Sequence, residues 1–247
     1  MIFYSRYPEF LPAIEPLTKL QSLDNGSLLS DSFLIEKEKE LAMYYAPHNE
    51  YINTNAQVVI VGITPGWSQM KAAFNRVVEL LDKGDNKEEI LKQAKIAASF
   101  SGQMRTNLIT MLNQCGLAEV LGIQTTAQLF TTSRSLLHTT SIIRYPVFCH
   151  GKNYTGHTPP IKKSKMLSRY AYEIFPEELK TLKKNALIIP LGKISEQITR
   201  SIRDDLEKNH TYLFGFPHPS GANGHRLRQF EQNYSRFRVD VKKWFGG

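Results

Sequence analysis

Short runs of apolar residues alternate with amphipathic segments along most of the chain. Four runs have the composition and length of buried strands: 57–63, 138–144, 186–191 and 211–216. Elsewhere apolar residues recur every three or four positions, as on one face of a helix, at about 85–98, 103–115, 194–206 and 226–245. Strands that alternate with helices form a parallel sheet covered on both faces. We therefore predict an α/β fold, a three-layer α/β/α sandwich around a four-stranded parallel sheet.

The N-terminal region has a different pattern. Residues 1–31 are of mixed polarity with several prolines, and we expect them to wrap around the core. Apolar positions in rough helical register predict a helix over 33–46. Because the sequence contains no repeat and no linker, we predict one domain over 1–247, with a helical wrap at 1–50 and an α/β core at 57–245.

Local signals at three positions refine the predicted helices. Asp85 followed by Glu88 resembles a capping box and predicts a helix start. Gly116 follows the helix at 103–115 and predicts its C-terminal cap. In the last helix we expect Leu227 to belong to an apolar stripe that packs on the core.

The charge of the chain indicates an anionic partner. Its 247 residues contain 31 Lys and Arg against 23 Asp and Glu, which gives a formal net charge of +8. No Asp or Glu occurs from Val120 to Tyr172. The basic residues of this acid-free segment are Arg134, Arg144, Lys152, Lys162, Lys163, Lys165 and Arg169. Such a segment suits a polyphosphate backbone, so DNA is the expected partner, although a mildly basic protein without a specific partner is the alternative.

Cysteine content and hydropathy indicate the compartment. Cys115 and Cys149 are too few for a disulfide framework, and this favours a reducing, cytoplasmic (intracellular) setting. Residues 1–10 have no long apolar core, so we expect no secretory signal. No run approaches the roughly 18 apolar residues of a membrane-spanning helix. We therefore expect no membrane partner.

The strand at 57–63 ends in the strongest indication of a ligand site. Its β-branched run reaches Gly62, and Pro65 and Gly66 follow at once. This pattern predicts a buried strand that breaks into a tight turn at its carboxyl end, where open α/β sheets bind ligands. The turn can offer backbone amides to a phosphate or a base. Alternatively, Gly and Pro only turn the chain.

Two further segments carry candidate chemistry. His218 lies between two prolines, and a neutral imidazole held there can stabilise a developing negative charge. Ser220, two residues later, can donate to a phosphate. Phe100 precedes Gly102 at the start of a predicted helix and can present its ring to a pocket. The alternatives are a surface turn around His218 and a core position for Phe100.

These segments resemble motifs of the uracil-DNA glycosylase superfamily. The matches occur in the family's order over about 57–245. They are the turn Gly62-Ile63-Thr64-Pro65-Gly66, the segment Phe100-x-Gly102 with Cys115-Gly116-Leu117 after its helix, the strand Thr140–Arg144, the strand end Pro190–Lys193, and His218-Pro219-Ser220. The most specific part is the pair formed by the Gly-x-x-Pro-Gly turn and the His-Pro-Ser segment.

The resemblance implies a uracil-DNA glycosylase-like fold and a DNA-repair enzyme. Such a hydrolase flips a damaged base out of DNA and hydrolyses its N-glycosidic bond, here as a monomer and without a metal or cofactor. The implied catalytic residues are His218, which bonds the base oxygen, and Thr64, at the position that orients water. The implied base contacts are Ile63, Phe100 and Ser141. The implied phosphate contacts are Pro65, Gly66, Lys193 and Ser220, and the implied duplex-insertion loop contains Asn223, His225 and Arg226.

Three departures from the family pattern keep other functions open. Thr64 replaces an acidic or amide residue, and its hydroxyl is a poor general base. Ser141 replaces an Asn, and one hydroxyl cannot make the two contacts of an amide. Cys115 and Cys149 cannot form the four-cysteine iron–sulfur site of the similar branch. Besides a glycosylase, we therefore consider a catalytically weak or inactive module that binds DNA or nucleotides, and a hydrolase of nucleotides or nucleosides.

Overall fold

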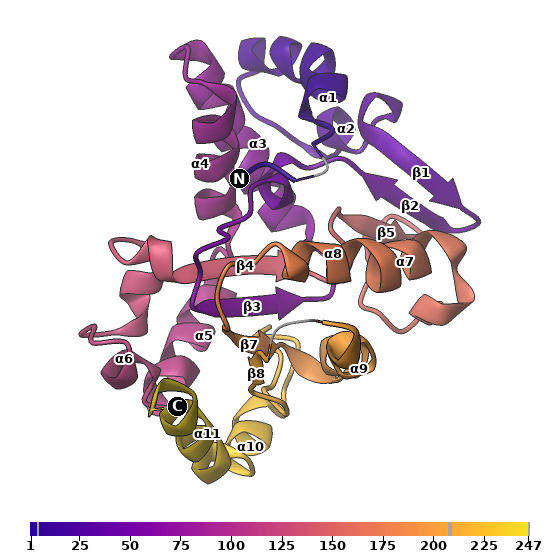
Figure 1. The fold of residues 1–247 in the computed structure, drawn as a ribbon. Helices are drawn as coiled ribbons and strands as arrows, with labels where there is room; N and C mark the ends of the chain where they lie inside the picture. Colours follow the sequence, from indigo (N-terminus) through magenta and orange to yellow (C-terminus); the bar gives the residue numbers. More distant parts are fainter. Residues whose placement is uncertain (4, 207–208, 247) are drawn as a thin grey trace. The chain divides into compact units, whose positions relative to one another are not determined.

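The computed structural model describes residues 1–3, 5–206 and 209–246 (Figure 1). The chain forms two compact units, each built from segments far apart in sequence. Unit 1 consists of Met1–Ile52, Ile63–Ser101 and Ser141–Phe175, and unit 2 of Asn53–Gly62, Gly102–Thr140 and Pro176–Gly247. No helix within the described ranges has the length and apolar character needed to span a membrane.

Unit 2 is built on the parallel sheet expected from the sequence. Its strands are β3 (Val58–Gly62), β4 (Leu137–Ser141), β7 (Leu187–Pro190) and β8 (Thr211–Tyr212), in the order β4-β3-β7-β8. Every residue of β3 and β7 is buried, which explains why both are continuous apolar runs in the sequence. The predicted α/β fold with a four-stranded parallel sheet is confirmed.

Six helices belong wholly or mainly to unit 2 among the described residues. They are α5 (Gln103–Gln114), α6 (Leu117–Val120), α8 (Phe175–Lys180), α9 (Gly192–Ile202), α10 (Arg226–Glu231) and α11 (Tyr234–Gly246). Helix α9 packs on β3 and β7. Gly116 follows α5 with a φ of 78°, in the left-handed region predicted for a cap.

The single helix predicted over 226–245 is wrong, because the chain turns between α10 and α11. Asn233 lies at this turn, and its Nδ2 donates to the carbonyl of Gln229 at 3.0 Å. Its Oδ1 accepts from the guanidinium of Arg236 at 2.7 Å. Short amide side chains compete in this way with helical backbone bonds, and the apolar periodicity does not reveal it.

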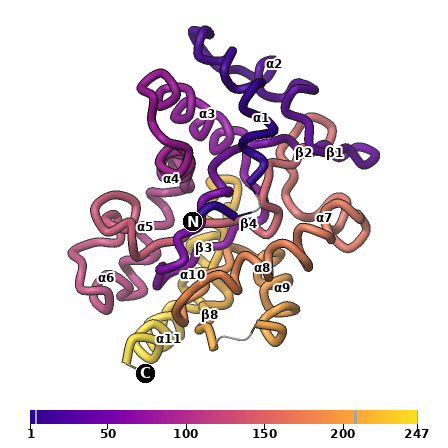
Figure 2. Tube along the Cα trace, turned by 45° about the horizontal axis from the view of Figure 1, so that its top comes forward, coloured from indigo at the N-terminus to yellow at the C-terminus, as the bar shows by residue number. Residues whose placement is uncertain are grey.

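Unit 1 contains five helices in the part of the chain that the structure describes. They are α1 (Tyr7–Ile14), α2 (Asn25–Leu28), α3 (Trp67–Asp82), α4 (Lys87–Ala98) and α7 (Lys165–Arg169). Helices α3 and α4 lie side by side (Figures 1 and 2). The capping box predicted at Asp85 is wrong: Asn86 is the N-cap of α4, and its Oδ1 accepts from the amide of Glu89 at 3.1 Å.

Unit 1 also contains an antiparallel sheet that the apolar pattern of the sequence does not predict. Its strands are β1 (Leu34–Glu38), β2 (Leu41–Tyr44), β5 (Val147–Cys149) and β6 (Lys152–Asn153), in the order β1-β2-β5-β6. The predicted helix over 33–46 is therefore wrong, and so is the wholly helical wrap at 1–50. Strand β2 alternates between buried and partly exposed residues, and its partner β5 lies about a hundred positions later in the chain. Such distant pairing overrides local helical register.

A fully buried carboxylate, Glu50, joins the N-terminal segment to the rest of unit 1. It accepts hydrogen bonds from the amides of Arg6 at 2.7 Å and Tyr7 at 3.2 Å, at the start of α1. It also accepts from the hydroxyls of Ser5 at 2.8 Å and Tyr145 at 3.1 Å. Burial raises the pKa of the Glu50 carboxyl despite these four donors. The carboxylate thus satisfies amides at a helix start that α1 itself cannot satisfy.

We expect Glu50→Ala to lower the free energy of unfolding by at least about 2 kcal/mol, because buried donors lose their acceptor. Urea titration followed by circular dichroism measures this loss. The control is Glu9→Ala, which removes an exposed ion pair with Arg6 in the same helix and should cost less than about 1 kcal/mol. Equal losses for the two variants would contradict the role assigned to Glu50.

Candidate functional site

The residues predicted to form the site divide between the two units. Unit 2 contains Lys193 and the loop from His218 to Arg226. Unit 1 contains the turn 63–66 together with Phe100 and Ser141. Each group is described on its own below.

His218 is a partly buried imidazole whose protonation state follows from its contacts. Its Nδ1 accepts a hydrogen bond from the amide of Ser220 at 3.2 Å, so the ring hydrogen of the neutral form lies on Nε2. Burial lowers the pKa of the His218 imidazole. Among the described residues no acceptor bonds Nε2. The loop therefore holds a neutral ring whose Nε2–H is available to a ligand.

Three side chains brace the backbone around His218. Asn107 donates to the carbonyl of Pro219 at 2.8 Å, Asn223 to that of His218 at 3.2 Å, and Arg226 to that of Ser220 at 3.1 Å. The family resemblance implies that Asn223 and Arg226 belong to a duplex-insertion loop, whereas here both side chains bond the backbone of their own loop. Asn107 lies in the helix that follows Phe100, and its sequence context predicts no role for it.

Leu227, at the second position of α10, is the large apolar residue exposed next to this loop. Its exposed fraction is 66%, whereas Phe230 of the same helix is buried at 4%. The prediction that Leu227 packs on the core is therefore wrong, because the buried face of α10 carries Phe230 and Leu227 lies outside that face. His225, which precedes α10, is also exposed. An exposed apolar side chain beside basic residues is the kind of group that proteins insert between bases.

Gly192 allows the start of α9 to approach His218 closely. Its φ is +80°, and a Cβ built there would lie 3.2 Å from the Cβ of His218. A side chain at this position is therefore both strained and crowded. Lys193 follows in the first turn of α9, so unit 2 brings this predicted phosphate contact near the His218 loop. Ser220 Oγ accepts from the amide of Ala222 at 3.2 Å and retains its hydrogen for another acceptor.

In unit 1, the hydroxyl of Thr64 makes two hydrogen bonds to one neighbouring segment. It donates to the carbonyl of Tyr145 at 2.8 Å and accepts from the amide of Val147 at 3.2 Å. Its single hydrogen is thus committed to the protein. A remaining lone pair can hold a water, but an alcohol does not take up a proton at neutral pH. The observed contacts make Thr64 a brace between the turn and strand β5.

The backbone amides of the same turn are already engaged. Pro65 has no N–H, and the Gly66 amide donates to Oε1 of Gln69 at 3.1 Å. The Trp67 amide donates to Oδ1 of Asn153 at 2.9 Å. The predicted phosphate contact at Pro65 and Gly66 therefore has no free backbone donor in this conformation.

Phe100 and Ser141 are both largely buried in unit 1. Phe100 is 5% exposed, so its ring offers little surface for a base. Its φ of +47° is rare for an aromatic residue, and such strain is concentrated at functional sites. Ser141 is 8% exposed at the end of β4. The amide of Ile143 donates to the carbonyl of Ile63 at 2.8 Å, which holds this strand end beside the turn.

The acid-free segment is only partly available to an anionic partner. Arg144 is 2% exposed, donates to the carbonyl of Phe3 and lies over the Phe3 ring. Arg169 pairs with Glu36, an acid from another part of the chain. The exposed cations of the segment include Lys152, Lys162, Lys163 and Lys165. Within the described ranges, no group of three or more His, Cys, Asp or Glu side chains could hold a metal ion.

We expect Thr64→Val to destabilise the protein by about 1–3 kcal/mol, because it leaves a buried carbonyl and a buried amide without their partner. Thr64→Ser keeps the hydroxyl and should lose markedly less. Denaturant unfolding of the wild type and both variants compares these costs. If Thr64→Val unfolds at the same denaturant concentration as the wild type, the hydroxyl is not a brace.

The ring of His218 should remain neutral at pH 7, with its hydrogen on Nε2. Because its pKa is lower in the folded than in the unfolded chain, His218 favours folding above about pH 6.5. That contribution is lost as the pH falls through the folded pKa. Nitrogen-15 NMR of labelled histidines, assigned with His218→Asn, reports both tautomer and titration. A ring that is protonated at pH 7, or has its hydrogen on Nδ1, would contradict the assignment.

Comparison with known proteins places the chain in a family. No model of a known protein family matches it. The uncharacterized protein YoxB of Bacillus subtilis (strain 168) is 50% identical over 224 residues, which cover 90% of this chain and 88% of YoxB. An identity of this level over nearly the whole of both chains means that the protein described here belongs to the same family as YoxB.

Proposed function

We propose that this protein is a DNA glycosylase with a uracil-DNA glycosylase-like fold. It hydrolyses the N-glycosidic bond of uracil or another altered base that has been flipped out of DNA, as in base-excision repair. The observation that carries the proposal is the neutral His218, whose Nδ1 is occupied by the Ser220 amide and whose Nε2–H is available.

The chemistry of base release explains why this donor matters. As the bond between C1′ and the base nitrogen breaks, its electron pair moves onto the base and the sugar becomes oxocarbenium-like. Negative charge then builds on the oxygen of the leaving pyrimidine. A rigid donor aimed at that oxygen stabilises the transition state more than the ground state. A neutral imidazole can donate to the oxygen without first transferring its proton.

Water completes the reaction by adding to C1′ and releasing a proton to the solvent, from which the departed base anion takes up a proton; an abasic site remains. In the proposed reaction, Thr64 does not take this proton, because its hydroxyl is bonded to Tyr145 and Val147. The oxocarbenium-like sugar is electrophilic enough for water to add without a strong base. We therefore assign most of the acceleration to His218 and expect a slower enzyme than one with a carboxylate at position 64.

Recognition of DNA is assigned to the surroundings of the His218 loop. Ser220 and Lys193 provide donors for phosphates flanking the extruded nucleotide. Leu227, which is 66% exposed, replaces Asn223 and Arg226 as the proposed group that fills the space left by the base. In unit 1, taken by itself, Ser141 is retained as the proposed reader of a base edge, with a single hydroxyl. That limited readout favours tolerance of several altered bases over strict uracil specificity.

A second candidate function is supported by Thr64 and Phe100. The Thr64 hydroxyl is committed to the backbone, and the Phe100 ring is 5% exposed. Both observations favour a module that binds DNA or nucleotides with little or no hydrolysis. Such a module predicts salt-dependent binding that survives His218→Ala, without base release.

Base release from synthetic DNA tests the proposal. Oligonucleotides that contain uracil, hypoxanthine, xanthine or a 5-substituted pyrimidine are incubated with excess protein and then cleaved by alkali at abasic sites. We expect strand cleavage with at least one of these bases. His218→Ala should slow single-turnover release by about 100- to 1000-fold, the loss typical of one transition-state donor.

Asn223→Ala serves as the matched control, since it alters the same loop but not the proposed donor. It should lower the rate less than His218→Ala and leave the preference among bases unchanged. Absence of cleavage across the whole panel would reject the glycosylase. Binding that persists in His218→Ala without any base release would favour the second candidate.

A further inference from the structure

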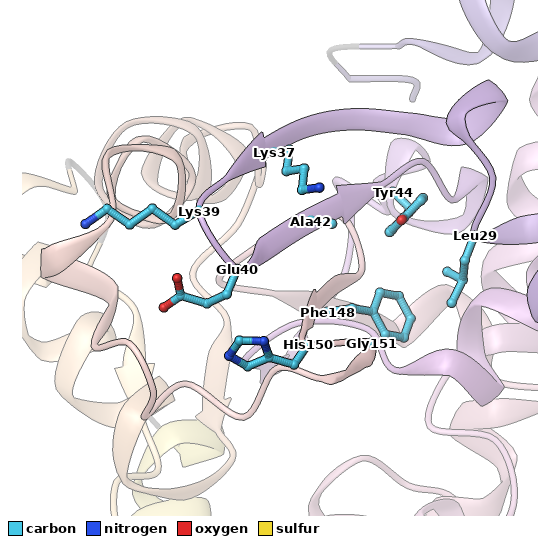
Figure 3. Close-up of a pocket in the computed structure, with 9 residues that line it drawn as sticks. All are labelled: Leu29, Lys37, Lys39, Glu40, Ala42, Tyr44, Phe148, His150 and Gly151. Carbon is cyan, nitrogen blue, oxygen red and sulfur yellow. The ribbon is translucent and has the colours of Figure 1, made fainter.

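A pocket of about 340 Å³ lies on unit 1 (Figure 3). It is lined by Leu29, Lys37, Lys39, Glu40, Ala42, Tyr44, Phe148, His150 and Gly151. All of these residues belong to unit 1, on or next to the antiparallel sheet. The volume is within the range of small-ligand sites.

The strand register explains why aromatic and basic side chains share this face. Ala42 of β2 lies opposite Lys37 of β1 and opposite Phe148 of β5, and cross-strand partners point to the same side of a sheet. Tyr44 follows Ala42 by two residues and therefore has the same orientation. The rings of Tyr44 and Phe148 meet edge to face, with centroids 5.8 Å apart. Phe148 is buried, so Tyr44 presents the available aromatic surface.

The charges around the pocket favour an anion at one end. Figure 3 shows the Lys37 side chain on β1 beside Ala42, whereas Lys39 and Glu40 project at the other end of the pocket. Lys37 and Lys39 are exposed, and neither forms an ion pair with any residue that the structure describes. Glu40 is the carboxylate among the lining residues, so an anion is favoured beside Lys37 rather than beside Glu40.

The rim of the pocket is preformed by two tight turns. Lys39 and His150 occupy these turns with φ values of 54° and 49°, in the left-handed region that few non-glycine residues adopt. The amide of His150 donates to the carbonyl of Glu40 at 3.2 Å, which joins the two turns. A ligand that binds there meets a surface already ordered by the sheet, so binding carries a small entropic cost.

We propose that this pocket binds a nucleotide unit, with the base stacked on Tyr44 and the 5′-phosphate bonded by Lys37. A planar ring next to a single cation is the combination that proteins use for nucleotides without base-specific readout. The source of the unit is either a free nucleotide or a single strand of DNA. This proposal does not depend on the glycosylase reaction, because none of its residues takes part in base release.

The pocket is connected to the first candidate turn through strand β5. Val147 donates to Thr64, and the next residue, Phe148, lines the pocket. Asn153, the cross-strand partner of Phe148, accepts from the amide of Trp67 at the start of α3. The pocket and this turn are therefore joined by hydrogen-bonded segments of unit 1.

Two probes without any altered base test the proposal: dTMP, measured by calorimetry, and a fluorescent short oligothymidylate, measured by anisotropy. We expect Tyr44→Leu to weaken binding about fivefold or more, the value of one base stack, while Tyr44→Phe keeps the ring and the affinity. For the oligonucleotide, Lys37→Ala should reduce the slope of log K against log salt by about 0.7.

Lys19→Ala is the matched control, since it removes another exposed lysine of unit 1. It should leave both the affinity and the salt slope as in the wild type. Loss of dTMP binding in Tyr44→Leu identifies a free-nucleotide site, and loss restricted to the oligonucleotide identifies a single-strand site. The proposal is overturned if neither probe binds, or if Tyr44→Leu and Lys37→Ala bind as tightly as Lys19→Ala with unchanged thermal unfolding.

Discussion

The hydrogen bonds of the Thr64 hydroxyl hold the candidate turn of unit 1 in place, and the neighbouring structure of this unit depends on them. The hydroxyl satisfies one backbone acceptor and one backbone donor of the same segment, Tyr145–Val147, and so holds the turn after β3 against β5. Strand β5 is an inner strand of the antiparallel sheet, between β2 and β6. The turn, the sheet and the aromatic pocket are thus parts of one hydrogen-bonded assembly within unit 1.

The contacts of His218 in unit 2 and of Thr64 in unit 1, each taken within its own unit, differ in what they offer the proposed chemistry. The departing base is provided with a donor, because the Ser220 amide and burial both favour a neutral His218 with its hydrogen on Nε2. In the proposed reaction, position 64 offers no general base to the incoming water, because the Thr64 hydroxyl is bonded to the backbone of Tyr145 and Val147. A reaction that depends on leaving-group stabilisation is compatible with the contacts of His218, whereas the contacts of Thr64 provide no base for one that depends on deprotonated water.

The parallel sheet could be predicted from the sequence, because β3 and β7 are buried on both faces and their apolar runs are unbroken. The antiparallel sheet could not, since β2 is ordered by β5 from a distant part of the chain and its own residues are compatible with a helix. The turn at Asn233 was missed for a related reason. It depends on side-chain hydrogen bonds that apolar periodicity does not encode.

At the candidate site, the types of residue could be predicted from the sequence, but the partners of their side chains could not. The sequence indicates that His218, Ser220 and Thr64 carry polar groups at turns. It does not indicate that Asn107 bonds the Pro219 carbonyl or that Asn153 bonds the Trp67 amide, because these partners lie 112 and 86 positions away. Arg144 illustrates the same limit, since its charge suggests phosphate binding whereas its burial against Phe3 excludes it.

The close approach of Gly192 to His218 has a consequence for how relatives of this protein diverge. A methyl group at Gly192 would meet the Cβ of His218 at 3.2 Å and would also require a φ of +80°. Selection that preserves the imidazole must therefore preserve the glycine as well. In an alignment of many relatives, Gly192 would then be as invariant as His218, and a ranking by conservation would not separate the imidazole from the glycine that leaves room for it.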